Sequence, residues 1–266
     1  MAITVSPPTE PSPSASTSAS RLASGIAPLR AGEGHEFLLR RLHSLSGIVP
    51  VGAFLFEHLA LSNSAAIKGP VSYAHQVAFL SNLPFVLFLE LFGIWLPLAF
   101  HGGYGIWLWY RGKGNLVNYS WAGNWMYSLQ RWTGGIAFVF ILYHTYTKRF
   151  SGVDLHDFPG ASFGKMQESL NNEWIFAFYV LGLIASCWHF GYGIWLFCCK
   201  WGIVVGERAR KRLLVLSVVF SLLLSAIGLR TLYAFTQWPQ QATDPAGAHA
   251  IEKSDSEIMH PSEGKK

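Results

Sequence analysis

The sequence predicts an all-α protein, an integral membrane bundle of five transmembrane helices. Two observations support this prediction. Only 13% of the 266 residues are charged and 51% are hydrophobic, whereas a soluble domain carries about 25% charged residues. Apolar runs near or above the roughly 20 residues needed to cross a bilayer occur five times along the chain. Inside a bilayer such runs must satisfy their own backbone polar groups, which favours helices.

The two ends of the chain differ in composition from this apolar centre. Residues 1–35 are rich in Ser, Pro, Ala and Thr and contain no apolar segment of the kind found in signal peptides, so a disordered cytoplasmic tail is expected. Residues 237–266 are polar with mixed charges, and a second disordered tail is expected on the outer side. Residues 36–236 then form the five-helix transmembrane domain.

The first two spans are predicted at residues 37–61 and 85–110. The first contains two glycines and a proline, which a membrane helix tolerates where neighbouring groups satisfy its backbone. The polar connection 62–83 separates the first span from the second, which carries His101 near its centre.

The other three spans are predicted at residues 127–147, 174–197 and 213–236. The third opens with several aromatic residues, a composition typical of the membrane–water interface. A mixed loop, residues 148–172, leads to the fourth span, and a short basic connection leads from the fourth to the fifth.

The basic residues predict how the chain is oriented in the membrane. Twelve of the twenty Lys and Arg residues lie in the N-terminal segment or in two short connections that would share its side, residues 111–131 and 200–212. Because short cytoplasmic connections carry an excess of Lys and Arg, we expect a cytoplasmic N-terminus and, after five crossings, an outer C-terminus. These short clusters at helix ends also argue against nucleic-acid binding as the role of the +5 net charge.

An eight-residue pattern occurs twice, inside the second and fourth spans. Residues 101–108 read His-Gly-Gly-Tyr-Gly-Ile-Trp-Leu and residues 189–196 read His-Phe-Gly-Tyr-Gly-Ile-Trp-Leu, so seven of eight positions agree. On a helix, Gly105 and Gly193 lie one turn beyond their histidines on the same face. A histidine beside such flat, open space favours a bulky planar ligand. The alternative is a pair of small-residue faces for close helix packing.

Four histidines fall one to each of the first four spans: His58, His101, His144 and His189. An ionisable side chain inside a membrane helix is costly and indicates a function. At about 1.5 Å per residue, His58 and His144 lie about 20–25 Å from the cytoplasmic edge, and His101 and His189 about 15 Å. We therefore expect His58 to face His144 at an outer level and His101 to face His189 at an inner level.

Two imidazoles from facing membrane helices are typical of b-type haem with both axial positions filled, which favours electron transfer. Zinc or copper is a weaker alternative, because no Cys or carboxylate accompanies either pair. The three cysteines show no C-x-x-C-H motif, which argues against covalent haem. Partners for the propionates of the inner haem are expected at the cytoplasmic boundary, among His43, Ser44, Trp125, Tyr127 and Lys200.

Together these features resemble the diheme cytochrome b subunit of succinate:quinone oxidoreductases, the succinate dehydrogenase/fumarate reductase family. The resemblance covers about residues 36–236. It rests on the four span histidines, the Glu57-His58-Leu59 segment, and the runs Phe-Leu-Leu-Arg-Arg-Leu-His-Ser-Leu-Ser-Gly at 37–47 and Asn-Trp-Met-Tyr-Ser-Leu-Gln-Arg at 124–131. It implies that the four histidines are the axial ligands of two b haems, in a bacterial cytoplasmic membrane.

The resemblance also implies partner subunits and a quinone. A flavoprotein and an iron–sulfur subunit would dock on the cytoplasmic face, and this chain would pass electrons between the iron–sulfur subunit and a quinone, usually menaquinone. Succinate chemistry is expected in the partners, because this chain has no dinucleotide-binding glycine motif and too few cysteines for a cluster. Candidates near an outer quinone are Glu57, His75 and Glu90, the last equally well a structural carboxylate.

Three alternatives stay open at this point. The chain could serve a fumarate reductase, because the same carriers work in either direction. It could serve another quinone-linked dehydrogenase, such as a formate dehydrogenase or a hydrogenase, although the runs at 37–47 and 124–131 favour the succinate dehydrogenase family. A transporter or structural bundle with histidine proton relays is the third alternative.

Overall fold

A computed structural model describes residues 31–112, 122–151, 154 and 157–244. All regular secondary structure in these residues is helical, which confirms the predicted all-α class. The chain divides into two compact units, residues 1–41 and 42–266.

The described part of the first unit is the beginning of helix α2 (Ala31–Ile48). Two contacts one turn apart support it: Arg40 pairs with Glu36 at 2.7 Å, and the Arg41 guanidinium lies 5.0 Å from the centre of the Phe37 ring. Such pairs stabilise a helix modestly. The predicted tail 1–35 lies outside the described residues except for its last five, which are helical.

The second unit continues the first predicted span through α3 (Pro50–Phe56), the π-helix η1 (Glu57–Ser62) and the 3₁₀-helix η2 (Asn63–Lys68). Pro50 stands at the start of α3, where its missing N–H costs least. The π-helical turn that carries His58 widens the helix locally, a distortion that is common at functional sites.

The second predicted span is formed by α5 (Val86–Leu89), the π-helix η3 (Glu90–Trp95) and α6 (Leu96–Arg111). A short helix, α4 (Pro70–Ser81), precedes it. Gly69 begins α4 with φ +115°, and a Cβ there would lie 2.8 Å from the Trp238 ring, so both the backbone conformation and the packing require glycine.

The third predicted span corresponds to α7 (Ala122–Thr145), which passes directly into the π-helix η4 (Tyr146–Phe150). The following loop contains more structure than its mixed composition indicates, namely the 3₁₀-helix η5 (Pro159–Ala161) and helix α8 (Ser162–Leu170). α8 is buried along most of its length because α4, α9 and α10 pack around it.

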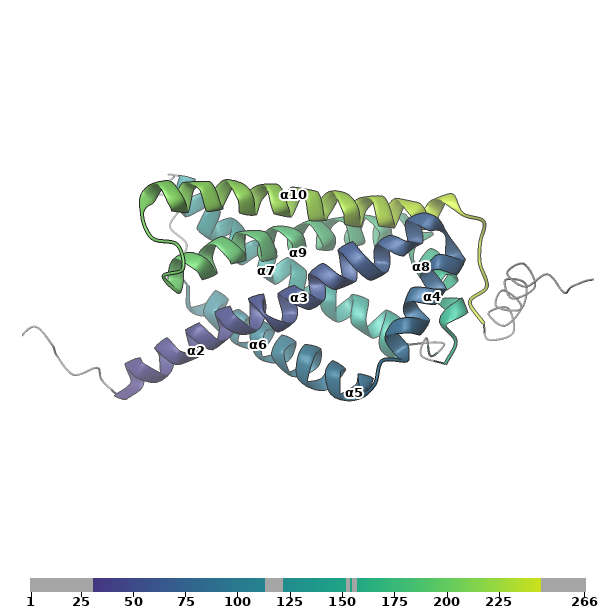
Figure 1. Ribbon diagram of the computed structural model, residues 1–266, viewed down its shortest axis with the longest axis horizontal. Helices are drawn as coiled ribbons and strands as arrows, with labels where there is room; N and C mark the ends of the chain where they lie inside the picture. Colours follow the sequence, from purple (N-terminus) through teal and green to yellow (C-terminus); the bar gives the residue numbers. More distant parts are fainter. Residues whose placement is uncertain (1–30, 113–121, 152–153, 155–156, 245–266) are drawn as a thin grey trace, which may run out of the picture. The chain divides into compact units, whose positions relative to one another are not determined.

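The fourth and fifth predicted spans are α9 (Glu173–Lys200) and α10 (Glu207–Gln237). The Asn172 side chain caps α9 by accepting from the backbone N–H groups of Trp174 and Ile175. α9 packs closely against both α7 and α10 (Figure 1). The buried core lies mainly between these helices and α8, and it includes Phe163, Tyr179, Cys187, Leu224 and Phe235. Cys187 is fully buried and free, as expected of a small apolar residue.

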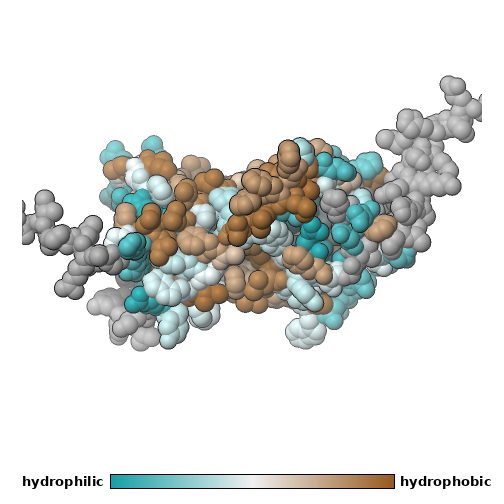
Figure 2. Space-filling model, turned by 90° about the horizontal axis from the view of Figure 1, so that it is seen from below, coloured by the Kyte–Doolittle hydropathy of each residue, from teal (hydrophilic) through white to brown (hydrophobic). Residues whose placement is uncertain are grey.

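Four helical segments of the described chain are long and apolar enough to cross a membrane: Gly34–Lys68, Val86–Arg111, Glu173–Lys200 and Glu207–Gln237. Hydrophobic side chains cover much of the face that Figure 2 shows, as expected of a multi-pass membrane protein. α7 is also long, at 24 residues, but its first half carries Asn124, Gln130 and Arg131. That α7 crosses as a fifth span stays a prediction.

The segment after α10 is held against α8 mainly by the Gln167 side chain, and Asn171 at the end of α8 adds a bond to Gln240 at 3.3 Å. The Gln167 amide donates to the carbonyls of Phe235 and Trp238 at 3.0 and 2.9 Å, and its oxygen accepts from the N–H of Gln241 at 2.9 Å. The predicted tail 237–266 therefore begins with ordered residues, while 245–266 lie outside the described residues.

Candidate functional site

The structure brings together the two histidines of the repeated eight-residue pattern. His101 lies on α6 and His189 on α9, with ring centres 6.1 Å apart and ring planes at 77°. A bond between a metal and an imidazole nitrogen is about 2 Å long. Ring centres at this separation are compatible with one metal ion bound between the two imidazoles.

The Nδ1 atoms of His101 and His189 are hydrogen-bonded to backbone carbonyls. His101 Nδ1 donates to the carbonyl of His43 at 2.9 Å, and His189 Nδ1 donates to the carbonyl of Gln130 at 3.0 Å. Because a carbonyl can only accept, each Nδ1 must carry the hydrogen and each Nε2 keeps its lone pair. This arrangement is typical of histidines that bind a metal through Nε2.

The other two span histidines also lie close together, but their ring nitrogens are less available to bind a metal. His58 in η1 and His144 on α7 have ring centres 5.8 Å apart and planes at 72°. His144 Nδ1 lies 3.3 Å from the Tyr179 hydroxyl. His58 Nε2, however, lies 2.9 Å from the Asn63 side-chain nitrogen, which can only donate and therefore occupies the Nε2 lone pair. His58 can bind a metal through Nε2 only after Asn63 moves away.

The ligand chemistry of both pairs fits haem. In the described residues no three of His, Cys, Asp and Glu gather as metal ligands, so each pair offers an ion two protein ligands. A porphyrin supplies the four remaining ligands of a six-coordinate iron, whereas zinc usually takes three or four ligands from the protein.

Of the five residues expected near the inner haem's propionates, His43 lies against a ligand ring. Its imidazole stacks on His101, with ring centres 4.1 Å apart and planes at 6°. Ser44 is half-buried on α2, and Lys200 is the exposed last residue of α9. Trp125 and Tyr127 are largely exposed at the start of α7.

The glycines of the repeated pattern adjoin protein groups. A Cβ on Gly105 would lie 3.2 Å from the His43 ring, and a Cβ on Gly193 would lie 3.7 Å from the side-chain nitrogen of Gln130. The flat space predicted beside them is therefore partly filled by the side chains of residues 43 and 130.

The three quinone candidates lie in different settings. Glu57 begins η1 beside His58 and is half-buried, and His75 is exposed on α4. Glu90 in η3 pairs with Arg149 at 3.2 Å, and Arg149 also lies 3.6 Å from Asp154. Glu90 is thus ion-paired, and whether it lies near a quinone stays a prediction.

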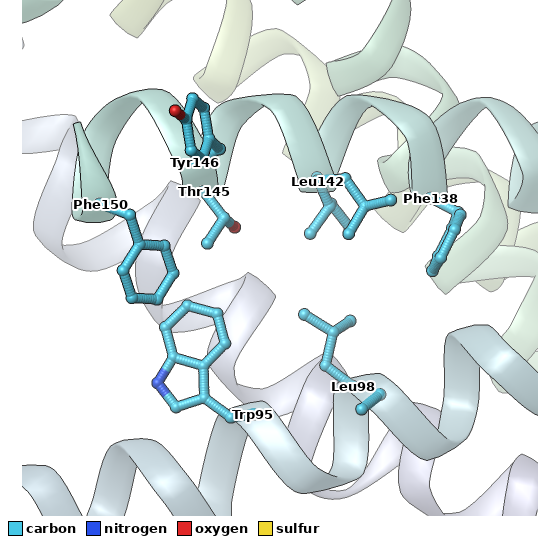
Figure 3. Close-up of a pocket in the computed structure, with 9 residues that line it drawn as sticks. Trp95, Leu98, Phe138, Leu142, Thr145, Tyr146 and Phe150 are labelled. Carbon is cyan, nitrogen blue, oxygen red and sulfur yellow. The ribbon is translucent and has the colours of Figure 1, made fainter.

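An apolar pocket that sequence reasoning did not predict lies between η3–α6 and α7–η4 (Figure 3). Its volume is about 280 Å³. Trp95 and Phe150 meet at one end with ring centres 5.5 Å apart, and Leu98 points into it from α6. Thr145 and Tyr146, which follow His144 directly in the chain, are among its lining residues. The pocket therefore lies at the level of α7 that carries His144.

Two lysines connect η4 and α8 through hydrogen bonds. Lys148 Nζ donates to the carbonyl of Lys165 at 2.8 Å and to the Ser169 hydroxyl, and Lys165 Nζ donates to the carbonyl of Ser151. Burial, with the nearby Lys165 charge, lowers the pKa of Lys148 to about 8, while Glu168 opposes the shift. Burial also lowers the pKa of Lys165.

Several contacts of the site were missed from sequence. A backbone carbonyl has no sequence signature, so the roles of His43 and Gln130 as acceptors could not be predicted from residue type. The sequence held one indication of this arrangement. The two pairs of acceptor and histidine have nearly the same separation along the chain, 58 residues for His43 and His101 and 59 residues for Gln130 and His189.

Comparisons with known proteins add two similarities. Residues 113–228, which include α7, α9 and most of α10, match the family model described as succinate dehydrogenase/fumarate reductase transmembrane subunit. Over 203 residues the chain is 35% identical to the succinate dehydrogenase cytochrome b558 subunit of Bacillus subtilis (strain 168). That alignment covers 75% of this chain and 97% of the relative.

Proposed function

The chain belongs to the succinate dehydrogenase/fumarate reductase transmembrane subunit family, and we propose that it is the membrane-anchor cytochrome b subunit of a succinate dehydrogenase, holding two b haems. The observation that carries the proposal is the inner histidine pair. His101 and His189 face each other with ring centres 6.1 Å apart, and both Nδ1 atoms are held by carbonyls.

His101 and His189 would hold the inner haem, and His58 and His144 the outer one once Asn63 has moved from His58 Nε2. Haem held by two histidines would supply one-electron transfer and leave no position for dioxygen. The helices orient the four imidazoles, and the carbonyls of His43 and Gln130 keep the protons of His101 and His189 at Nδ1.

The chain's partners follow from this role. We propose that a flavoprotein and an iron–sulfur subunit dock on the cytoplasmic face, with the N-terminus on the same side of a bacterial cytoplasmic membrane. The clustered basic residues at the start of α10 support this orientation, because Lys and Arg concentrate on the cytoplasmic side. The curated relative is a succinate dehydrogenase subunit, which favours succinate oxidation over fumarate reduction.

We place the quinone, of the menaquinone class, in the apolar pocket beside His144. An aromatic wall formed by Trp95 and Phe150 suits a flat quinone ring. Thr145, which lines the pocket, offers a hydroxyl group to its oxygens. A site with apolar walls and a few polar groups is the usual form of a small-molecule pocket.

The haem assignment is tested on the purified complex by its reduced-minus-oxidised absorption spectrum and by its haem content. The wild-type chain should contain about two b haems, and His101→Ala or His189→Ala should lose the inner haem, because each removes one of its two axial ligands. His35→Ala, which alters an exposed histidine outside the predicted spans, is the control and should keep both. A His101→Ala complex with two intact haems would refute the assignment.

A further inference from the structure

The two inner histidines are held in the same way by two different helices. His101 Nδ1 donates to the carbonyl of residue 43, and His189 Nδ1 donates to the carbonyl of residue 130. Each carbonyl belongs to an α-helix, α2 or α7. A helix carbonyl is normally the acceptor of the N–H four residues later, so the imidazole must approach it from the side.

Glycine stands four residues after each of these carbonyls. A Cβ on Gly47 would lie within 2.6 Å of His101 Nδ1, and a Cβ on Gly134 would lie 2.7 Å from His189 Cε1 and 3.0 Å from its Nδ1. The side chain of residue i+4 in a helix lies beside the carbonyl of residue i, which is why Ser and Thr hydrogen-bond there. Any side chain at 47 or 134 would therefore occupy the place of the imidazole.

The contact is reciprocal, because each histidine also has a glycine four residues later. Gly105 adjoins the side chain of His43, and Gly193 adjoins the side chain of Gln130. Gln130 adds a further bond, from its side-chain amide to the carbonyl of His189 at 2.9 Å. Each unit thus consists of a histidine and a glycine on one helix, and a carbonyl-bearing residue and a glycine on the other.

We propose that this unit, which we call the histidine–glycine clasp (His101 and Gly105 with His43 and Gly47; His189 and Gly193 with Gln130 and Gly134), positions the two axial ligands of the inner haem. The proposal rests on the proposed haem function. Gly47 and Gly134 are positioning residues: they admit each imidazole to a helix carbonyl, which fixes hydrogen at Nδ1 and presents Nε2 to the iron.

The clasp also explains two positions of the repeated eight-residue pattern, the histidine and the glycine four residues after it. Gly105 and Gly193, one turn after the histidines, leave space for the side chains of His43 and Gln130. The imidazoles of His101 and His189 in turn occupy the space beside Gly47 and Gly134. The outer pair lacks this arrangement: the Tyr179 hydroxyl, not a backbone carbonyl, lies beside His144 Nδ1.

The clasp is tested by four glycine-to-alanine variants in the assembled complex. Gly47→Ala and Gly134→Ala fill the place of an imidazole. Gly103→Ala and Gly135→Ala are the matched controls, because nothing lies within 4 Å of a Cβ at either position. Haem content, the electron paramagnetic resonance spectrum of the oxidised haems and the midpoint potential of each haem are measured, beside His101→Ala and His189→Ala.

Gly47→Ala should reproduce His101→Ala, with loss of the inner haem and retention of the outer one. Gly134→Ala should reproduce His189→Ala or, since its contacts are looser, keep the inner haem with a shifted resonance spectrum and potential. The controls should match the wild type. The clasp is overturned if Gly47→Ala and Gly134→Ala both keep an unaltered inner haem. It is also overturned if they lose haem that the histidine variants retain, because such a loss indicates a general packing defect. A wild-type complex without haem would instead refute the proposed function.

Discussion

The second nitrogen of each span histidine decides how ready that histidine is to bind the iron of the proposed haems. At the inner pair both Nδ1 atoms donate to carbonyls, so the tautomer that leaves Nε2 available is already set. At the outer pair the Asn63 amide occupies His58 Nε2 at 2.9 Å. The inner site is therefore preorganised, whereas binding at the outer site must first break a hydrogen bond.

This difference predicts the effect of removing the Asn63 amide. Asn63→Ala should leave the outer haem in place and tighten its binding to the haem-free protein by about fivefold, because a hydrogen bond of about 1 kcal/mol no longer competes. Haem titration of the apoprotein, followed by absorption, measures the change. His58→Ala provides the comparison and should abolish the outer haem; an Asn63→Ala protein that also lost it would show that Asn63 supports the site.

Residue type alone revealed the four span histidines, because an ionisable side chain in an apolar run stands out in the sequence. Their partners did not stand out. Asn63 lies in a connection predicted to be polar, where an amide is ordinary, and Tyr179 is one of several aromatic residues in α9. Contacts between a side chain and a distant backbone carbonyl depend on helix packing, which periodicity does not determine.

At the scale of the elements, hydrophobic runs located the long helices well and the segments between them poorly. The five predicted spans correspond to helical segments, although α7 is less apolar than the others. The connection 148–172 was predicted as a mixed loop, yet it contains η5 and α8. α8 is buried by α4, α9 and α10, and such burial of a short polar helix depends on its tertiary neighbours.

The same connection should make stability depend on pH. The pKa of Lys148 is about 8 in the folded chain, lowered from the usual lysine value of 10.5 mainly by burial. Between these two values the unfolded chain binds more protons than the folded chain, so stability rises with pH in this window and is lowest below about pH 8. The lowered pKa of Lys165 acts in the same direction.

Hydrogen exchange at the amides of α8 measures this dependence. Protection should increase between about pH 8 and pH 10, after correction for the intrinsic rate, and Lys148→Met should remove most of the increase. Lys211→Met alters an exposed lysine at the start of α10 and should retain it. Protection that fell with pH in the wild type would contradict the assignment of the buried charge to Lys148.

At the scale of the whole bundle, the two histidine pairs lie on different helices and at different levels: His58 and His144 on η1 and α7, His101 and His189 on α6 and α9. On α7, Gln130 lies at the inner pair, and His144, with the pocket residue Thr145, lies at the other end. The 15 residues from Gln130 to Thr145 correspond to about 22 Å of helix. If the basic clusters mark the cytoplasmic side, the pocket lies toward the outer side, far from the face proposed for the iron–sulfur subunit.

This separation predicts that quinone binding and succinate oxidation can be impaired independently. Leu98→Trp places a large side chain in the pocket and should raise the KM for quinone on the order of tenfold, a loss of about 1.4 kcal/mol in binding. Succinate reduction of a soluble dye should be unchanged, because the flavoprotein and iron–sulfur partners are untouched. Leu96→Trp is the matched control, since Leu96 lies on the same helix, is 51% exposed and does not line the pocket. An unchanged KM for quinone in Leu98→Trp, with both haems retained, would place the quinone elsewhere on the chain.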